Sequence, residues 1–143
     1  EDGGLGLEGA DSKCQAFADK EGLGGTWKAW LGTSSTAPRD RFTGVWYNVD
    51  GEKAVTNAGG AVGPATAVIK GANGASPGAV WTGSTDVGGR SDFRCNDWSD
   101  DSPDAAGNTG NAAIDSTESG KASWAGNDKK ACEAKFPLYC FEQ

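Results

Sequence analysis

Four cysteines in a chain without histidine constrain this protein more than any other feature of its sequence. They stand at positions 14, 95, 132 and 140, and no two of them form a Cys-x-x-Cys pair. This spacing, with no histidine to complete a mixed set of ligands, argues against zinc. We therefore expect two disulfides and an oxidising compartment. Four cysteines allow three pairings, and the sequence alone does not choose among them.

Glycine makes up 23 of the 143 residues, and only 36% of the residues are hydrophobic. This composition predicts one domain with a modest core and much irregular backbone. Ordering each residue costs about 1–2 kcal/mol, so cross-links matter. A disulfide closing more than about 100 residues contributes about 4–5 kcal/mol, and one closing a few dozen about 3–4 kcal/mol. No apolar run approaches the roughly 20 residues that cross a bilayer, so we expect no membrane insertion.

The net charge and the missing histidine exclude two classes of function. Thirteen basic and twenty acidic side chains give a net charge of −7, which repels nucleic-acid phosphates. Histidine is the side chain that most often transfers protons near neutral pH. We therefore expect a protein that is not an enzyme, and we assign it no definite cofactor, with calcium as the one candidate. A glycosidase using two carboxylates is the remaining catalytic alternative, although nothing in the polar segment that holds the candidate aspartates would raise the pKa of an acid.

The first third of the chain predicts a linker, a helix and a strand. Residues 1–10 are glycine-rich and acidic, as in a flexible linker or stalk end. From Asp11, with Asp11 or Ser12 as N-cap, apolar residues recur at helical spacing until Gly22. Residues 23–31 alternate as a half-buried strand does. The expected buried face holds Trp27, Ala29 and Leu31, and the opposite face holds Lys28 and Trp30.

The middle of the chain predicts a hairpin between irregular segments. Residues 33–41 are polar and indicate a loop, whereas 42–49 are aromatic and β-branched, as in a strand. The Asp50-Gly51 dipeptide is a hairpin turn signal, with 52–55 as the returning strand. Residues 56–77 indicate irregular structure with one short strand at most.

The last part predicts short strands around a long polar loop. Strands are expected over 79–83 and over 90–98, the second with a cysteine near its end. Residues 99–120 are almost wholly Asp, Ser, Asn, Gly and Ala, which predicts a loop held at both ends. A brief strand at 122–124 and a final strand over 135–142 complete the chain.

Three blocks in this order resemble the C-type-lectin-like fold, and in detail the endostatin domain of collagens. They are CQAFADKEGLGGTWKAWL from Cys14, AVWTGSTDVGGR from Ala79 with the later Cys-Asn-Asp-Trp, and Cys132 with the closing LYCFE. The chain is also similar to a bacterial family of exported domains that includes the C-terminal domain of the Legionella collagen-like adhesin. The resemblance implies a loop-rich α+β domain over residues 11–143, with short antiparallel sheets and one or two helices.

The resemblance also implies a disulfide pairing, a location and a function. The nested disulfides would be Cys14–Cys140 and Cys95–Cys132. The protein would be secreted or exposed on the cell surface, as a non-catalytic adhesin tip that recognises a glycan or a cell-surface protein. The alternative is a cap that trimerises a stalk or fibre, which would be a homotrimer. Ice binding ranks lower, because regular Thr-x-Thr arrays are missing.

The polar loop and the tryptophans supply the expected site residues. Oxygen donors suited to calcium are Asp97, Asp100, Asp101 and Asp104, with a solvated acidic loop as the alternative. The sugar-binding motifs of calcium-dependent lectins are missing. We expect Trp27, Trp81 and Trp98 in the core. The predicted ligand-binding residues are Trp46, Trp124, Asn96, Asp97 and Asn108.

Two known endostatin activities do not transfer to this chain. The zinc site of endostatin uses histidines, which this chain lacks. Heparin binding is disfavoured by the acidic surplus, and a local basic patch would consist of Arg39, Arg41 and Lys28.

Overall fold

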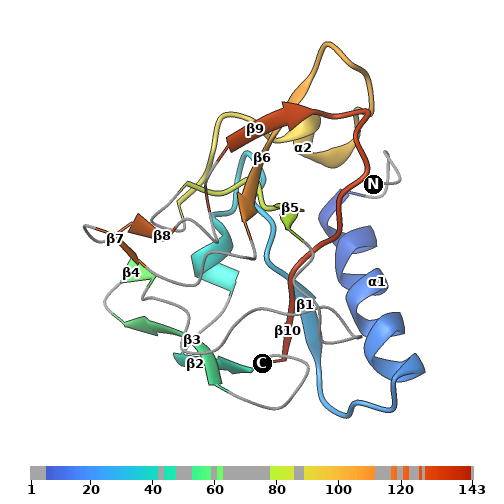
Figure 1. Ribbon diagram of the computed structural model, residues 1–143. Helices are drawn as coiled ribbons and strands as arrows, with labels where there is room; N and C mark the ends of the chain where they lie inside the picture. The colour runs from blue at the N-terminus through green and yellow to red at the C-terminus, as the bar shows by residue number, and fades with distance from the viewer. Residues whose placement is uncertain are drawn as a thin grey trace.

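The computed structural model combines a long helix with short antiparallel strands, which is the predicted α+β class (Figure 1). It describes residues 6–41, 44–47, 53–58, 61–62, 78–85, 89–111, 117–118, 121–122, 126 and 128–142. In 44–47, 53–58, 61–62, 117–118 and 121–122 only the backbone is described. Within these ranges, no helix is long and apolar enough to cross a membrane.

Helix α1 spans Gly6–Lys20 and therefore begins five residues before the predicted start at Asp11. The prediction that 1–10 is a linker is wrong for its second half, where Gly9 and Ala10 are buried. Burial against the rest of the fold overrides the low helix propensity of glycine here. The helix ends as predicted: the amides of Gly22 and Leu23 donate to the carbonyls of Asp19 and Ala18, with Gly22 at φ +71°.

The first sheet has five antiparallel strands in the order β1-β10-β2-β3-β4. Their bounds are β1 Trp27–Ala29, β2 Gly44–Tyr47, β3 Lys53–Ala58, β4 Ala61–Val62 and β10 Cys140–Glu142. The predicted hairpin is confirmed by the pairing of β2 with β3. The last strand lies between β1 and β2, so the end of the chain is an interior strand of this sheet and not an edge strand.

The second sheet has the order β5-β6-β9, and a separate two-stranded ladder joins β7 to β8. Their bounds are β5 Ala79–Trp81, β6 Ala106–Asn111, β7 Thr117–Glu118, β8 Lys121–Ala122 and β9 Asp128–Ala131. The prediction of a loop over 99–120 is wrong for β6, which pairs with β5 and β9, and for the short strand β7, which pairs with β8. The small side chains of β6 allow it to pack between the Cys95–Cys132 disulfide and Trp81. A Cβ on Gly107 would lie 2.7 Å from both the Cys95 sulfur and the Trp81 ring.

Element α2 (Cys95–Trp98) replaces the end of the strand predicted over 90–98. Its four residues have positive φ, at 48°, 50°, 54° and 68°, so it is a single left-handed turn. Left-handed backbone costs roughly 1–2 kcal/mol per residue outside glycine. The surrounding structure offsets this cost by holding both ends of the turn, because Cys95 is in a disulfide and Trp98 is buried.

The core lies between α1 and the two sheets and is rich in tryptophan. Trp27, Trp81 and Trp98 are buried, as predicted, and the rings of Trp81 and Trp98 lie 5.7 Å apart. Trp30 is also fully buried, although the strand alternation placed it on the polar face. Strand β1 ends at Ala29, so the alternation no longer applies at Trp30.

Two disulfides close the fold, and they are the pairs that the resemblance implies. Cys14–Cys140 links α1 to β10 across 126 residues, and Cys95–Cys132 links α2 to the segment after β9 across 37. One therefore joins the first helix to the last strand, and the other holds the late part of the chain against the second sheet.

Candidate functional site

Loop 33–36 contacts the segment 89–97. Next to this contact, the backbone at Gly32 packs closely against the backbone at Thr82 and Gly83. The Gly32 amide donates to the Thr82 carbonyl at 2.8 Å, and a Cβ on Gly32 would lie 2.3 Å from the Gly83 carbonyl oxygen. The indole N–H of Trp98 donates to the Gly32 carbonyl at 2.7 Å. These buried contacts of Gly32 hold the two segments in a fixed position relative to each other.

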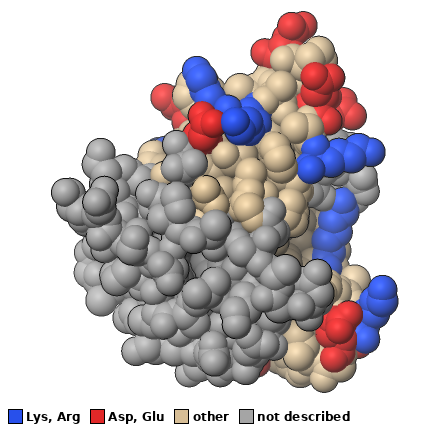
Figure 2. All heavy atoms as spheres, viewed as in Figure 1, with Lys and Arg blue, Asp and Glu red and all other residues tan. Residues whose placement is uncertain are grey.

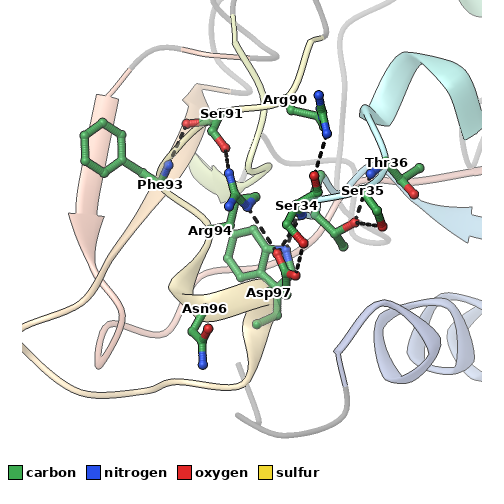
Figure 3. A network of polar contacts seen from close by, with 12 residues as sticks. Ser34, Ser35, Thr36, Arg90, Ser91, Phe93, Arg94, Asn96 and Asp97 are labelled. Carbon is green, nitrogen blue, oxygen red and sulfur yellow. Dashed lines mark hydrogen bonds and ion pairs between the residues drawn. The ribbon is translucent and has the colours of Figure 1, made fainter.

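Asp97 joins the two segments through side-chain contacts at the surface (Figure 3). Its carboxylate accepts hydrogen bonds from the Ser34 amide at 2.7 Å, the Ser34 hydroxyl at 2.5 Å and Arg94 Nε at 3.1 Å. Burial raises the pKa of Asp97, but the bonds from Ser34 and Arg94 outweigh it and the pKa is lowered overall. Asp97 is therefore an ionised carboxylate, and the hydrogen bonds it accepts come from Ser34 and Arg94 of the same chain.

Two arginines complete this cluster, which we call the α2 network: Ser34, Arg90, Ser91, Arg94 and Asp97. Arg94 also donates to the Ser91 carbonyl. Arg90 donates through Nη1 to the Ser34 carbonyl at 2.5 Å and is exposed. Ser34 thus uses its amide, hydroxyl and carbonyl within the network, whereas a guanidinium has five N–H donors and Arg90 keeps several for other partners.

Loop 33–36 holds its own shape by local bonds. The Thr33 amide donates to the Thr36 carbonyl at 3.0 Å, and the Thr36 amide donates to the Thr33 hydroxyl at 3.2 Å. The hydroxyls of Thr33 and Ser35 lie 3.4 Å apart. Ser34 and Ser35 are exposed at the tip of this turn, next to Arg90. The loop presents hydroxyl groups beside a guanidinium on a fixed backbone.

The structure separates the predicted ligand-binding residues. Asp97 is the centre of the α2 network, and the Asn96 side chain points away from it (Figure 3) and donates to Ser99 Oγ at 3.0 Å. Asn108 lies in β6, where its side chain donates to the Ser84 carbonyl. Trp46 lies in β2 with only its backbone described, and Trp124 lies outside the described residues.

The four predicted calcium ligands are not brought together. Asp97 faces Ser34 and Arg94, while Asp100 accepts the Ser102 amide at 2.9 Å, and the bonds from Ser102 lower the pKa of Asp100. Asp101 and Asp104 are exposed. In the described part of the chain, no three carboxylate or cysteine side chains gather in a way that could hold a metal ion. Acidic side chains instead spread over the top of the molecule, towards the loop between α2 and β6 (Figure 2).

Arg41 does not contribute to a basic patch with Arg39 and Lys28, because its side chain is directed inwards. Its side chain is 9% exposed and pairs with Asp11 of α1 at 2.5 Å while donating to the Ala29 carbonyl. Asp11 in turn accepts the Ala29 amide at 3.0 Å. Arg41 therefore fastens α1 to β1. Basic side chains follow one another along the α1 side of the surface, and an acidic group lies near its lower end (Figure 2).

Sequence reasoning missed Ser34, Arg90 and Arg94 as partners of Asp97. Ser34 is 63 residues from Asp97 in the chain, and no spacing or motif connects them. The comparisons add no assignment: no protein-family model matches the chain, and no curated protein matches it significantly. Function must therefore be argued from the α2 network and the groups that surround it.

Proposed function

We propose that this protein is a non-catalytic extracellular binding module of the C-type-lectin-like, endostatin-like type, and that it recognises a glycan or a protein surface. The proposed contact surface consists of loop 33–36 and Arg90. The observation that carries this proposal is that Ser34 joins loop 33–36 to segment 89–97: its amide and hydroxyl donate to Asp97, and its carbonyl accepts from the exposed Arg90.

Binding is favoured over catalysis by the chemistry of the α2 network. Asp97 is engaged by three donors and its pKa is lowered, so it is unsuited to act as a proton donor near neutral pH. The exposed groups next to it are the Ser35 hydroxyl and the Arg90 guanidinium. These groups form hydrogen bonds to hydroxyl, carbonyl or carboxylate groups of a ligand. Fixing them in advance reduces the entropy cost of binding.

The extracellular location and the family are supported by the covalent frame. Two disulfides persist in oxidising compartments such as the cell exterior. The Cys14–Cys140 bond joins the opening helix to the closing strand, which agrees with the nested arrangement of the proposed family. A cross-linked scaffold with one fixed loop surface suits the tip of an adhesin.

The proposal is tested by screening glycan and extracellular-protein panels with the wild type and two variants. Arg90→Ala removes the exposed guanidinium, and Lys20→Ala, at the end of α1, removes the same charge elsewhere. A hydrogen bond from a charged group contributes about 1.5–3 kcal/mol, so Arg90→Ala should weaken binding roughly 10- to 150-fold. Lys20→Ala should bind as the wild type does.

Two results would overturn the proposal. Blank panels combined with turnover in a glycosidase assay would show that the protein is an enzyme. Equal affinity of Arg90→Ala and wild type for an identified ligand would show that the ligand binds elsewhere.

A further inference from the structure

Strand β9 forms the outer edge of the β5-β6-β9 sheet (Figure 1). Its first three residues, Asp128, Lys129 and Lys130, are all exposed. Because successive side chains of a strand point to opposite faces, both faces of β9 are uncovered at this point. Such an edge is a template for pairing with another chain unless something closes it.

The hydrogen-bonding pattern shows which backbone groups of β9 face outwards. The Cys132 amide donates to the Ala105 carbonyl at 3.0 Å. In an antiparallel ladder, hydrogen-bonded pairs alternate with pairs that are not bonded. Lys130, opposite Gly107, is therefore bonded to β6, whereas Lys129 and Ala131 direct their amides and carbonyls away from it.

The other side of β6 agrees with this assignment. Asn108 is the register partner of Lys129. Its amide donates to the Phe93 carbonyl at 2.9 Å, and its carbonyl accepts the Thr82 amide at 3.0 Å. The Asn108 backbone is thus engaged on the side away from β9, as expected of a pair that is not bonded.

Two of the four outward groups are already occupied within the chain. The Lys129 amide donates to Asp128 Oδ1 at 2.8 Å, and Asp128 Oδ2 pairs with Lys130 Nζ at 2.7 Å. The Ala131 carbonyl accepts the Ala134 amide at 3.0 Å. In the described residues, the Lys129 carbonyl and the Ala131 amide have no such partner.

An added antiparallel strand needs both the amide and the carbonyl of one edge residue. Lys129 offers only its carbonyl and Ala131 only its amide, so neither residue can form the two-bond pair. A two-fold symmetric dimer through this edge would set β9 antiparallel to its copy. We propose that Asp128 closes the β9 edge against antiparallel pairing with a second copy of this chain.

Lys129 adds a second barrier to the same pairing. Centred on Lys129, the antiparallel pair would place the two Lys129 side chains opposite each other, and like charges there destabilise. In the monomer Lys129 lies over the Phe93 ring, 4.5 Å from its centroid. The inference concerns self-association and does not depend on the proposed binding function.

Three variants test the role of Asp128 by sedimentation equilibrium at neutral pH. Lys129→Thr removes the like charge and keeps the Asp128 acceptor. D128A/K129T removes both barriers, and D128N/K129T removes the charge at residue 128 but keeps a side-chain oxygen that accepts the same amide. We expect D128A/K129T to self-associate at least ten-fold more tightly than the other two variants. All changes are at exposed positions, and circular dichroism checks the fold.

Equal association of D128A/K129T and K129T would overturn the proposal. So would equal association of D128N/K129T and D128A/K129T, because charge rather than the lost acceptor would then explain the change. In the wild type, the amide proton shift of Lys129 should follow the titration of Asp128 in NMR spectra. A Lys129 shift that does not respond to this carboxylate would contradict the hydrogen bond on which the proposal rests.

Discussion

Gly107→Ala tests whether β6 depends on a position without a side chain. Gly107 lies between the Cys95–Cys132 disulfide and the Trp81 ring, and an added Cβ would be 2.7 Å from both the Cys95 sulfur and the ring. Neither neighbour can move easily, because Cys95 is cross-linked and Trp81 is buried against Trp98. Overpacking of this kind costs roughly 1–3 kcal/mol, and the entropy gain of replacing glycine offsets about 0.4–1 kcal/mol.

We therefore expect Gly107→Ala to lower the free energy of unfolding by about 1–2 kcal/mol, or the melting temperature by roughly 3–8 °C. Urea denaturation of the oxidised protein, followed by tryptophan fluorescence, measures this change. Gly24→Ala is the matched control, because no atom lies within 4 Å of its added Cβ and its φ is not positive. If Gly107→Ala were as stable as Gly24→Ala, the close packing of β6 on the disulfide would be refuted.

Three further predictions concern charges and the longer disulfide. Because the pKa of Asp97 is lowered in the fold, its stabilising effect is complete above the unfolded pKa and is lost as pH falls through the folded value. The stability gap between the wild type and Asp97→Asn, whose asparagine tolerates positive φ, should therefore narrow below about pH 4 in denaturant titrations; a gap independent of pH would contradict the ion pair between Asp97 and Arg94. Arg41→Met should cost roughly 2–3 kcal/mol in the same assay, because it leaves the Asp11 carboxylate without its partner; an unchanged midpoint would show that the pair does not hold α1 to β1. The free energy of unfolding of C14A/C140A should be lower by about 5 kcal/mol, because the disulfide closes a loop of 126 residues in the unfolded chain. A denaturation midpoint equal to that of the wild type would argue against this source of stability.

Elements with a clear period or turn signal could be predicted from the sequence. The β2–β3 hairpin follows from its aromatic and β-branched run and from the turn signal of the Asp50-Gly51 dipeptide in the sequence, and the end of α1 follows from Gly22. The burial of Trp27 and Ala29 follows from alternation along β1. In each of these cases, residues close in the chain determine the structure.

Elements that depend on distant partners could not be predicted. Strand β6 carries no large apolar side chain, and it is a strand because β5 and β9 pair with it and Gly107 fits against Trp81. The left-handed turn α2 is imposed by its surroundings, and only Asn96 and Asp97 among its residues favour such backbone. The bond between Asp97 and Ser34 joins residues 63 positions apart, so chain neighbours give no sign of it.

The most direct test of the binding surface is amide mapping by NMR with a ligand recovered from the panels. Shifts that concentrate at Ser34, Ser35, Thr36 and Arg90 are the predicted outcome, because Asp97 holds Ser34 and the Ser34 carbonyl accepts from Arg90. Shifts confined to α1 or to the β2–β3 hairpin would show that a different surface binds the ligand and would contradict the account.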